Sequence, residues 1–168
     1  MIIYHGGTEE IQKPDIEHSK TYLDFGKGFY TTSFKEQAER WAVRKSMRSG
    51  KNEPVVSVYD LQEQFEGYSV LEFRDVVDDE AWLDFVCDCR NGKDDFKEYD
   101  IIIGNVANDD VFKTVDMYFR GVWDKQRTLQ ELKYYKKNNQ IAFISQKAID
   151  GLLEFKESYV ARTENDKA

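Results

Sequence analysis

The chain has 168 residues, of which 40% are hydrophobic and 14% aromatic. This length fits one domain of ordinary size, and this composition is that of a globular protein, which excludes a disordered chain. Lys and Arg number 24 against 32 Asp and Glu, so the formal net charge is −8. An acidic surface argues against a broad nucleic-acid-binding face, which has to be basic.

The sequence contains no recognisable signal for export or membrane insertion. Its first ten residues, MIIYHGGTEE, lack a basic stretch followed by an apolar run, and no window approaches the roughly 18 apolar residues of a membrane span. Cys87 and Cys89 have no second Cys or His pair nearby. We interpret them as thiols of a reducing cytoplasm rather than as a metal site or a disulfide. We therefore expect a cytoplasmic protein without a metal.

The first part of the chain predicts three strands. The apolar run from Met1 to Tyr4 predicts a strand that closes on a turn at His5-Gly6-Gly7. Residues 8–24 are polar and predict a surface loop with at most one helical turn. Aromatic and β-branched residues predict two further strands, over residues 29–32 and 54–59.

A long helix is expected between these two strands. Ser33 is a favourable N-cap, and Glu36 three residues later completes a capping box. The helix is expected to end near Ser49-Gly50. Its apolar stripe consists of Phe34, Ala38, Trp41, Ala42 and Met47.

The second part of the chain alternates between strands and helices. Strands are expected over residues 68–73, 99–104, 140–145 and 152–160. Helices are expected over residues 78–90, 109–119, 124–135 and 146–151. The chain has no internal repeat and no linker, so we expect one α+β domain over residues 1–160, followed by a flexible tail over residues 161–168.

Three groups of residues are candidates for chemistry. His5 precedes two glycines, which would let a ligand approach the backbone, although a structural histidine explains the same pattern. Tyr30 and Trp41 could hold a planar ligand between them, although Trp41 also fits a plain core position. The third group is a basic helix stripe that could meet a pyrophosphate or lie solvated: Arg40, Arg44 and Arg48, with Lys45 and Lys51 close by.

The glycines at Gly26 and Gly28 do not indicate a Rossmann turn. Such a turn follows a strand and opens directly into a helix, whereas this pair precedes the strand-like residues 29–32. No phosphate-binding G-x-x-x-x-G-K-[ST] motif is present either. We therefore reject a dinucleotide-binding Rossmann fold.

Taken together, three motifs resemble the NAD-binding half of ADP-ribosyltransferases of the diphtheria-toxin and poly(ADP-ribose) polymerase type. They are Tyr4-His5-Gly6, the run GKGFYTT from Gly26 to Thr32, and Trp41 one helix later. That group reads Y-H-G-T, then K-G-F/I-Y-x-T/A, often a second aromatic, and then a strand that begins with glutamate. The order of elements fits over residues 1–160, and the detailed match covers residues 1–45. The resemblance implies a split β-sandwich of mixed, largely antiparallel strands with flanking helices, in a bacterial branch of that superfamily.

The resemblance also implies roles for individual residues. His5 would hydrogen-bond the adenosine-side ribose, the Gly6 backbone would hold the nicotinamide amide, Tyr30 would stack on the nicotinamide, and Trp41 would supply the second aromatic. Gly7 stands where the family usually has Thr or Ser, so that hydroxyl contact is lost or supplied by Thr8. The implied NAD-binding set is His5, Gly6, Gly7, Gly28, Phe29, Tyr30, Thr31 and Trp41.

The strand after these three motifs departs from the family pattern. Gln140 opens the strand that should begin with the catalytic glutamate, whose carboxylate would hold the ribose 2′-hydroxyl and stabilise the oxocarbenium-like centre. Glutamine keeps the hydrogen bond but has no net charge, which would cost roughly 10²–10³ in rate. Asp109 or Asp110 could supply a carboxylate instead, although both residues also fit plain helix-start positions.

The implied function is NAD-dependent mono-ADP-ribosyl transfer to a macromolecule inside the cell, with His5, Tyr30 and Gln140 as the catalytic set and no metal. The acceptor is expected to be a protein rather than a nucleic acid. Toxin, defence and regulatory roles all fit, and the first would bring a small inhibitory or antitoxin partner. Three alternatives stay open: a catalytically silent NAD-binding module, an NAD glycohydrolase, and an interaction domain with no ligand.

Overall fold

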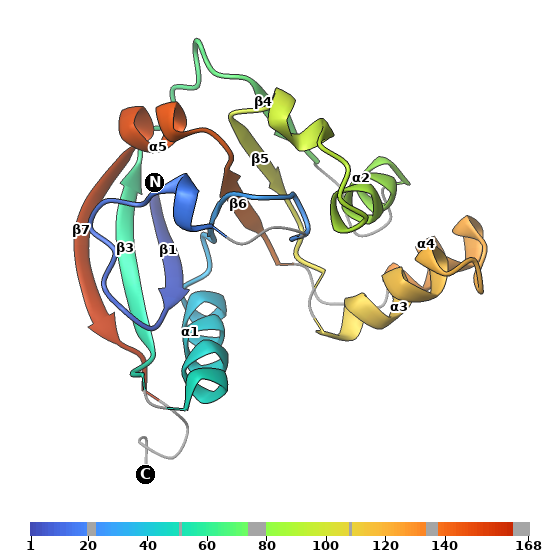
Figure 1. Cartoon of the computed structure of the whole chain (residues 1–168), viewed down its shortest axis with the longest axis horizontal. Helices are drawn as coiled ribbons and strands as arrows, with labels where there is room; N and C mark the ends of the chain where they lie inside the picture. The colour runs from blue at the N-terminus through green and yellow to red at the C-terminus, as the bar shows by residue number, and fades with distance from the viewer. Residues whose placement is uncertain (20–22, 51, 74–79, 108, 134–137, 163–168) are drawn as a thin grey trace.

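The computed structural model describes the chain except for residues 20–22, 51, 74–79, 108, 134–137 and 163–168. Within the described ranges the protein is α+β, with two β-sheets and five α-helices (Figure 1). This fold class agrees with the sequence-based prediction. None of the described helices is both long and apolar enough to cross a lipid bilayer. The predicted tail lies mostly at residues 163–168, outside the described residues.

The first sheet is antiparallel and has three strands in the order β1-β3-β7. They are β1 (Ile2–Gly7), β3 (Val55–Leu61) and β7 (Leu153–Val160). The second sheet is mixed and has four strands in the order β2-β6-β5-β4, of which only the β4–β5 pair is parallel. They are β2 (Phe29–Thr31), β4 (Val70–Glu72), β5 (Ile101–Gly104) and β6 (Gln140–Phe143). This topology agrees with the rejection of a Rossmann fold, whose sheet is largely parallel.

The helices flank both sheets. They are α1 (Lys35–Ser49), α2 (Glu80–Arg90), α3 (Asp109–Phe119), α4 (Lys125–Leu132) and α5 (Gln146–Leu152). Two short 3₁₀ turns, η1 (Ile16–His18) and η3 (Asp95–Glu98), lie in the connections. Helix α1 packs beside the first sheet, whereas α2, α3 and α4 lie on the side of the second sheet that faces away from the first (Figure 1).

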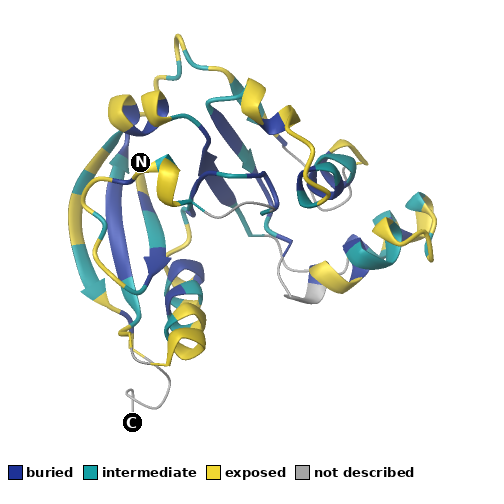
Figure 2. Cartoon of the chain, in the orientation of Figure 1, coloured by how far each residue is buried: buried dark blue, intermediate teal, exposed yellow. Residues whose placement is uncertain are grey.

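Three apolar layers hold these elements together. The inner layer joins the two sheets and α5, through residues such as Ile3, Tyr59, Ile101 and Phe143. A second layer joins the opposite face of the second sheet to α2, α3 and α4, and Trp82 is its largest fully buried side chain. The third layer lies between α1 and the first sheet and is small. Figure 2 shows the resulting pattern, with buried strands in the middle and exposed helix faces outside.

Strand β1 runs further than the sequence predicts. His5, Gly6 and Gly7 were expected in a turn, but they pair with Ser57, Val56 and Val55 of β3, so the turn prediction is wrong. The glycines serve the packing of the strand on α1. A β-carbon on Gly6 would meet the Ala38 carbonyl oxygen and would lie 2.8 Å from the Ala42 nitrogen. Only glycine allows the strand and the helix to approach so closely.

The start of α1 also differs from the prediction. Phe34, not Ser33, is the N-cap, and its side chain makes no capping hydrogen bond. The Ser33 hydroxyl instead accepts a hydrogen bond of 2.6 Å from the Asn139 amide, so the predicted capping box does not form. The buried stripe is narrower than expected, because Phe34 and Met47 are 48% and 77% exposed. The helix ends as predicted, with Gly50 in a left-handed conformation at φ 75°.

Replacing Gly6 by alanine should separate α1 from β1. The added β-carbon cannot be accommodated against helix backbone, so Gly6→Ala is expected to lower the free energy of unfolding by about 3 kcal/mol. Gly7→Ala is the matched control, because its β-carbon would lie at an ordinary 3.4 Å from the nearest atom, His5 Nε2. Urea denaturation of the two variants measures the difference, and equal losses would contradict this account of Gly6.

Candidate functional site

A cleft of about 830 Å³ opens between β1, β2, α1 and the loop that follows β1. Six of the nine residues expected to bind NAD or to catalyse line this cleft: His5, Gly28, Phe29, Tyr30, Trp41 and Gln140. They come from β1, the turn before β2, β2 itself, α1 and β6. The three others, Gly6, Gly7 and Thr31, are buried beside the cleft and do not line it.

His5 is half-buried on the face of β1 that looks toward β2. Its Nδ1 lies 2.7 Å from the Tyr30 carbonyl oxygen, and its ring stacks on Phe29 at a centroid distance of 4.4 Å. Because a carbonyl oxygen only accepts, Nδ1 carries the proton and Nε2 keeps a lone pair. Burial, with the nearby Lys45 charge, lowers the pKa of His5 to about 3. His5 is therefore a neutral imidazole that can accept a hydrogen bond at Nε2.

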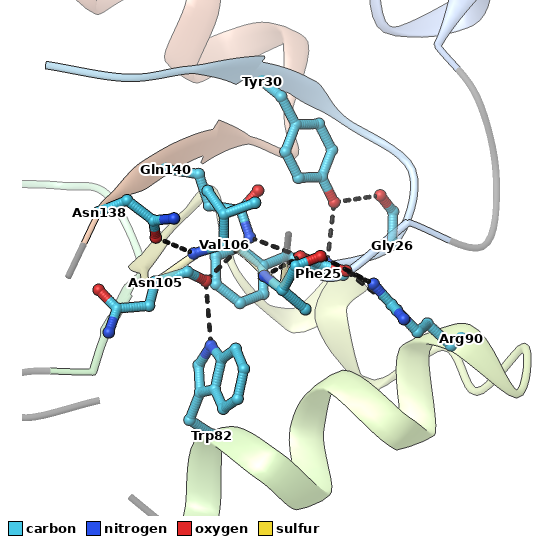
Figure 3. Close-up of polar contacts among 11 residues, drawn as sticks. Phe25, Gly26, Tyr30, Trp82, Arg90, Asn105, Val106, Asn138 and Gln140 are labelled. Carbon is cyan, nitrogen blue, oxygen red and sulfur yellow. Dashed lines mark hydrogen bonds and ion pairs between the residues drawn. The ribbon is translucent and has the colours of Figure 1, made fainter. Parts of the chain in front are cut away.

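Tyr30 presents its ring to the cleft, and its hydroxyl is fixed at the base. The hydroxyl donates to the Gly26 carbonyl oxygen at 2.6 Å and accepts from the Phe25 backbone nitrogen at 2.9 Å (Figure 3). Gly26 has φ 78°, which permits the tight turn that brings both groups to the hydroxyl. Burial and the nearby Asp24 carboxylate raise the pKa of Tyr30 well above its usual value. The two hydrogen bonds of the hydroxyl thus fix the orientation of the Tyr30 ring.

Gly6, Gly7 and Thr31, which do not line the cleft, contact the residues around it. The Gly6 carbonyl accepts a hydrogen bond of 2.7 Å from Lys45 Nζ, and the Thr31 hydroxyl donates to the Ile141 carbonyl oxygen at 3.0 Å. Gly7 lies next to His5 Nε2. These three positions shape the wall behind His5 and Tyr30.

Gln140 lies at the inner end of the cleft and is 3% exposed. Its Nε2 donates to Asp24 Oδ2 and to the Asn105 carbonyl oxygen, both at 3.1 Å (Figure 3). The same Asn105 oxygen accepts from Trp82 Nε1 at 3.1 Å. Both neighbours of Nε2 are acceptors, so the amide satisfies them from this position and an ionised carboxylate could not.

Asp24 is the residue that the sequence did not reveal. This carboxylate is 8% exposed and lines the cleft. Its Oδ1 accepts from Arg90 Nε at 2.9 Å and also from Arg90 Nη2, and its Oδ2 accepts from the Ala107 nitrogen at 2.8 Å and from Gln140. The only sequence signal was an acid between Leu23 and Phe25, which is common in turns.

Helix α1 supplies three basic residues to the lining of the cleft. Arg44, Lys45 and Arg48 of α1 line it together with Lys13 of the opposite loop, whereas Arg40 does not. Part of the basic stripe predicted from the sequence therefore faces the cleft. Trp41 also lines the cleft and is half-buried, so the interpretation as a plain core residue is wrong.

Two other pairs of residues were interpreted from the sequence, the two cysteines and the two aspartates at the start of α3. Cys87 and Cys89 are free and buried, and burial raises their thiol pKa values to about 11 and about 12. At neutral pH both are unreactive thiols. Helix α3 begins at Asp109 as expected, but the side chains of Asp109 and Asp110 lie outside the described residues, so their catalytic role stays a prediction.

The family model of DUF3990, described as a protein of unknown function, matches residues 1–155. The chain belongs to the DUF3990 family. Comparison with curated proteins and with solved structures gives no match. The matched range of this DUF3990 protein contains every residue that lines the cleft.

The neutral state of His5 should make stability depend on pH. The folded pKa of about 3 lies below the value of 6.5 expected in the unfolded chain, so below pH 6.5 the unfolded chain binds a proton that the folded protein excludes. This contribution is complete above pH 6.5 and falls as the pH drops toward 3. At pH 5 it should have cost about 1–2 kcal/mol. His5→Asn retains a donor to the Tyr30 carbonyl oxygen. Its free energy of unfolding in urea denaturation should fall less between pH 7 and pH 5 than that of the wild type. An identical fall would contradict the assignment of His5 as a neutral imidazole.

Replacing Gln140 by glutamate should destabilise this DUF3990 protein rather than improve it. An ionised carboxylate at this position would have no hydrogen to donate to Asp24 Oδ2 or to the Asn105 carbonyl oxygen, and both oxygens would repel it. We expect a loss of about 3 kcal/mol at pH 8. The loss should shrink at pH 5, because the neighbours raise the pKa of the new carboxyl group and it then stays protonated. Gln140→Met, which adds no charge, controls for the lost hydrogen bonds and should show no such pH dependence in thermal melts.

Proposed function

We propose that this protein binds NAD in the cleft and transfers ADP-ribose from it to a macromolecule, with release of nicotinamide. One observation carries the proposal: His5, Tyr30 and Gln140 lie 25 or more residues apart in sequence, yet line a single cleft. They stand at the positions of the histidine, the tyrosine and the catalytic glutamate of the ADP-ribosyltransferases, with glutamine in place of the glutamate. The cleft volume of about 830 Å³ also lies in the usual range of about 300–1,000 Å³ for small-molecule sites.

The arrangement of the sheets supports the same superfamily. Two sheets of mainly antiparallel strands face each other across the inner apolar layer, as in a split β-sandwich. Strands β1 and β2 meet at the junction, where Tyr4 and Thr32 exchange two backbone hydrogen bonds of 2.9 and 3.0 Å. This junction places the motif that contains His5 beside the motif that contains Tyr30.

Each group in the cleft suits one part of NAD. His5 Nε2 would accept a hydrogen bond from a ribose hydroxyl, and the Tyr30 ring would stack on the nicotinamide, with Trp41 as a second aromatic wall. Arg44, Lys45 and Arg48 of α1 would face the pyrophosphate. The loop after β1 contributes Glu9, Glu10 and Asp15 to the same cleft, so α1 supplies the side that suits the anionic part of the ligand.

The test combines NAD labelled on its adenylate part, purified protein and a cell lysate. The protein should label an acceptor and release nicotinamide, and His5→Ala and Tyr30→Ala should each lower both rates by about 10-fold or more, which corresponds to about 1.4 kcal/mol. Phe119→Ala is the control, because this half-exposed ring on α3 does not line the cleft. Labelling that survives in both cleft variants would refute the assignment.

The same experiment separates the alternatives. Nicotinamide release without any labelled macromolecule would identify an NAD glycohydrolase. NAD binding in calorimetry without release would identify a silent binding module. A melting temperature that NAD does not change would leave an interaction domain with no nucleotide.

A further inference from the structure

The amide of Gln140 has one orientation. Its two N–H groups face two acceptors, Asp24 Oδ2 and the Asn105 carbonyl oxygen, each 3.1 Å from Nε2. The opposite orientation would point Oε1 at both acceptors and would repel them. Among the described residues, no group donates a hydrogen bond to Oε1. The amide can therefore offer a ligand in the cleft only its Oε1, as an acceptor.

Asp24 cannot take the place of a catalytic glutamate directly. A carboxylate has about four acceptor positions, and Asp24 fills them with two donors from Arg90, the Ala107 nitrogen and Gln140. A substrate hydroxyl would have to displace one of these donors. Any effect of Asp24 on a ligand in the cleft has to pass through a residue that Asp24 contacts. Among the donor side chains, Gln140 is the one that also carries an acceptor, because arginine has none.

We propose that Asp24 and Gln140 form a carboxylate–amide pair that replaces the glutamate of related transferases. Arg90 binds Oδ1 and Gln140 binds Oδ2, so the negative end of the Asp24–Arg90 ion pair is directed at the amide. A carboxylate that accepts from Nε2 polarises the amide and makes Oε1 a stronger acceptor. Asp24 is thus a positioning residue, and Gln140 is the group that would touch the substrate.

This inference rests on the proposed function and specifies one step of it. The bond between C1′ of the ribose and the ring nitrogen of the nicotinamide breaks, and its electron pair leaves with the nitrogen, which gives neutral nicotinamide. Positive charge develops at C1′ and the ring oxygen. Gln140 Oε1 accepts a hydrogen bond from the 2′-hydroxyl and stabilises this charge. The acceptor nucleophile then bonds to C1′ and loses its proton, where it has one, to solvent. No proton passes to or from Asp24 in this step.

The test is a double-mutant cycle on Asp24 and Gln140. Asp24→Asn removes the charge and keeps the size, and Gln140→Met removes the acceptor and keeps the length. Each should lower the rate of nicotinamide release by about 30-fold, with the Kd for NAD in calorimetry changed by less than about threefold. The double variant should lose little more than either single variant, because Asp24 acts through Gln140. Thermal melts identify the variants that remain folded.

Three results would overturn the pair. The first is a normal rate of nicotinamide release in Gln140→Met. This variant keeps the Asp24 carboxylate and the three hydrogen bonds that Arg90 and Ala107 donate to it, so it is expected to fold. The second is a normal rate in folded Asp24→Asn. The third is a double variant whose loss equals the product of the single losses. In all three the wild type remains active, so the proposed function stands. A wild type that binds NAD and releases no nicotinamide would refute the function, and the pair with it.

Discussion

The buried carboxylate of Asp24 is the interaction on which the inner end of the cleft depends. Burying a charge is costly unless hydrogen bonds replace its hydration, and Asp24 has four, two of them from a cationic partner. They join four segments: the turn before β2, the C-terminal end of α2, the loop after β5 and the first residue of β6. These segments are separated by up to 116 residues in the chain. Without this charge they would have no common polar partner.

Neighbouring amides extend this network along the start of β6. Asn138 Oδ1 accepts from the Val106 nitrogen at 2.9 Å, and Asn139 Oδ1 accepts from the Thr32 hydroxyl at 2.9 Å. Gln140 then reaches Asp24. Three successive polar side chains thus connect β6 to the loop after β5, to the end of β2 and to the turn before it. Hydrogen bonds thus hold the side chains at this end of the cleft in defined positions, which suits a site that has to hold a ligand in one geometry.

Much of the fold could be predicted from local patterns, because strands and helices have characteristic periodicities. The alternation or apolar runs at residues 54–59, 99–104 and 140–145 predicted β3, β5 and β6, and the pattern of α1 predicted its C-terminal end. The failures have a common cause. Gly6 and Gly7 were interpreted as a turn, and Ser33 as an N-cap, from their local preferences alone. Their actual roles depend on α1 and on Asn139, which are far away in sequence.

The candidate site shows the same division. His5, Tyr30 and Trp41 could be selected because the short motifs that contain them resemble those of ADP-ribosyltransferases. Asp24, Arg90 and Asn105 could not, because nothing near them in sequence shows that they meet. Asp24 is 66 residues from Arg90 and 83 from Ala107. A buried polar network consists of such long-range pairs, so a single sequence shows the residue types but not the pairing.

The neighbours of Gln140 change how its identity is interpreted. Compared with the motif of the ADP-ribosyltransferases alone, glutamine at this position looks like the loss of a catalytic charge. In the structure the position faces a carboxylate and a carbonyl oxygen, and a second carboxylate there would be repelled by both. Glutamine suits this environment because its amide donates to both acceptors, and the negative charge lies one hydrogen bond away, on Asp24. The inner end of the cleft therefore contains a carboxylate, that of Asp24, although β6 has no glutamate. Whether that charge reaches a substrate depends on the amide between them, so a search for activity in this family should consider residues 24 and 140 as one unit.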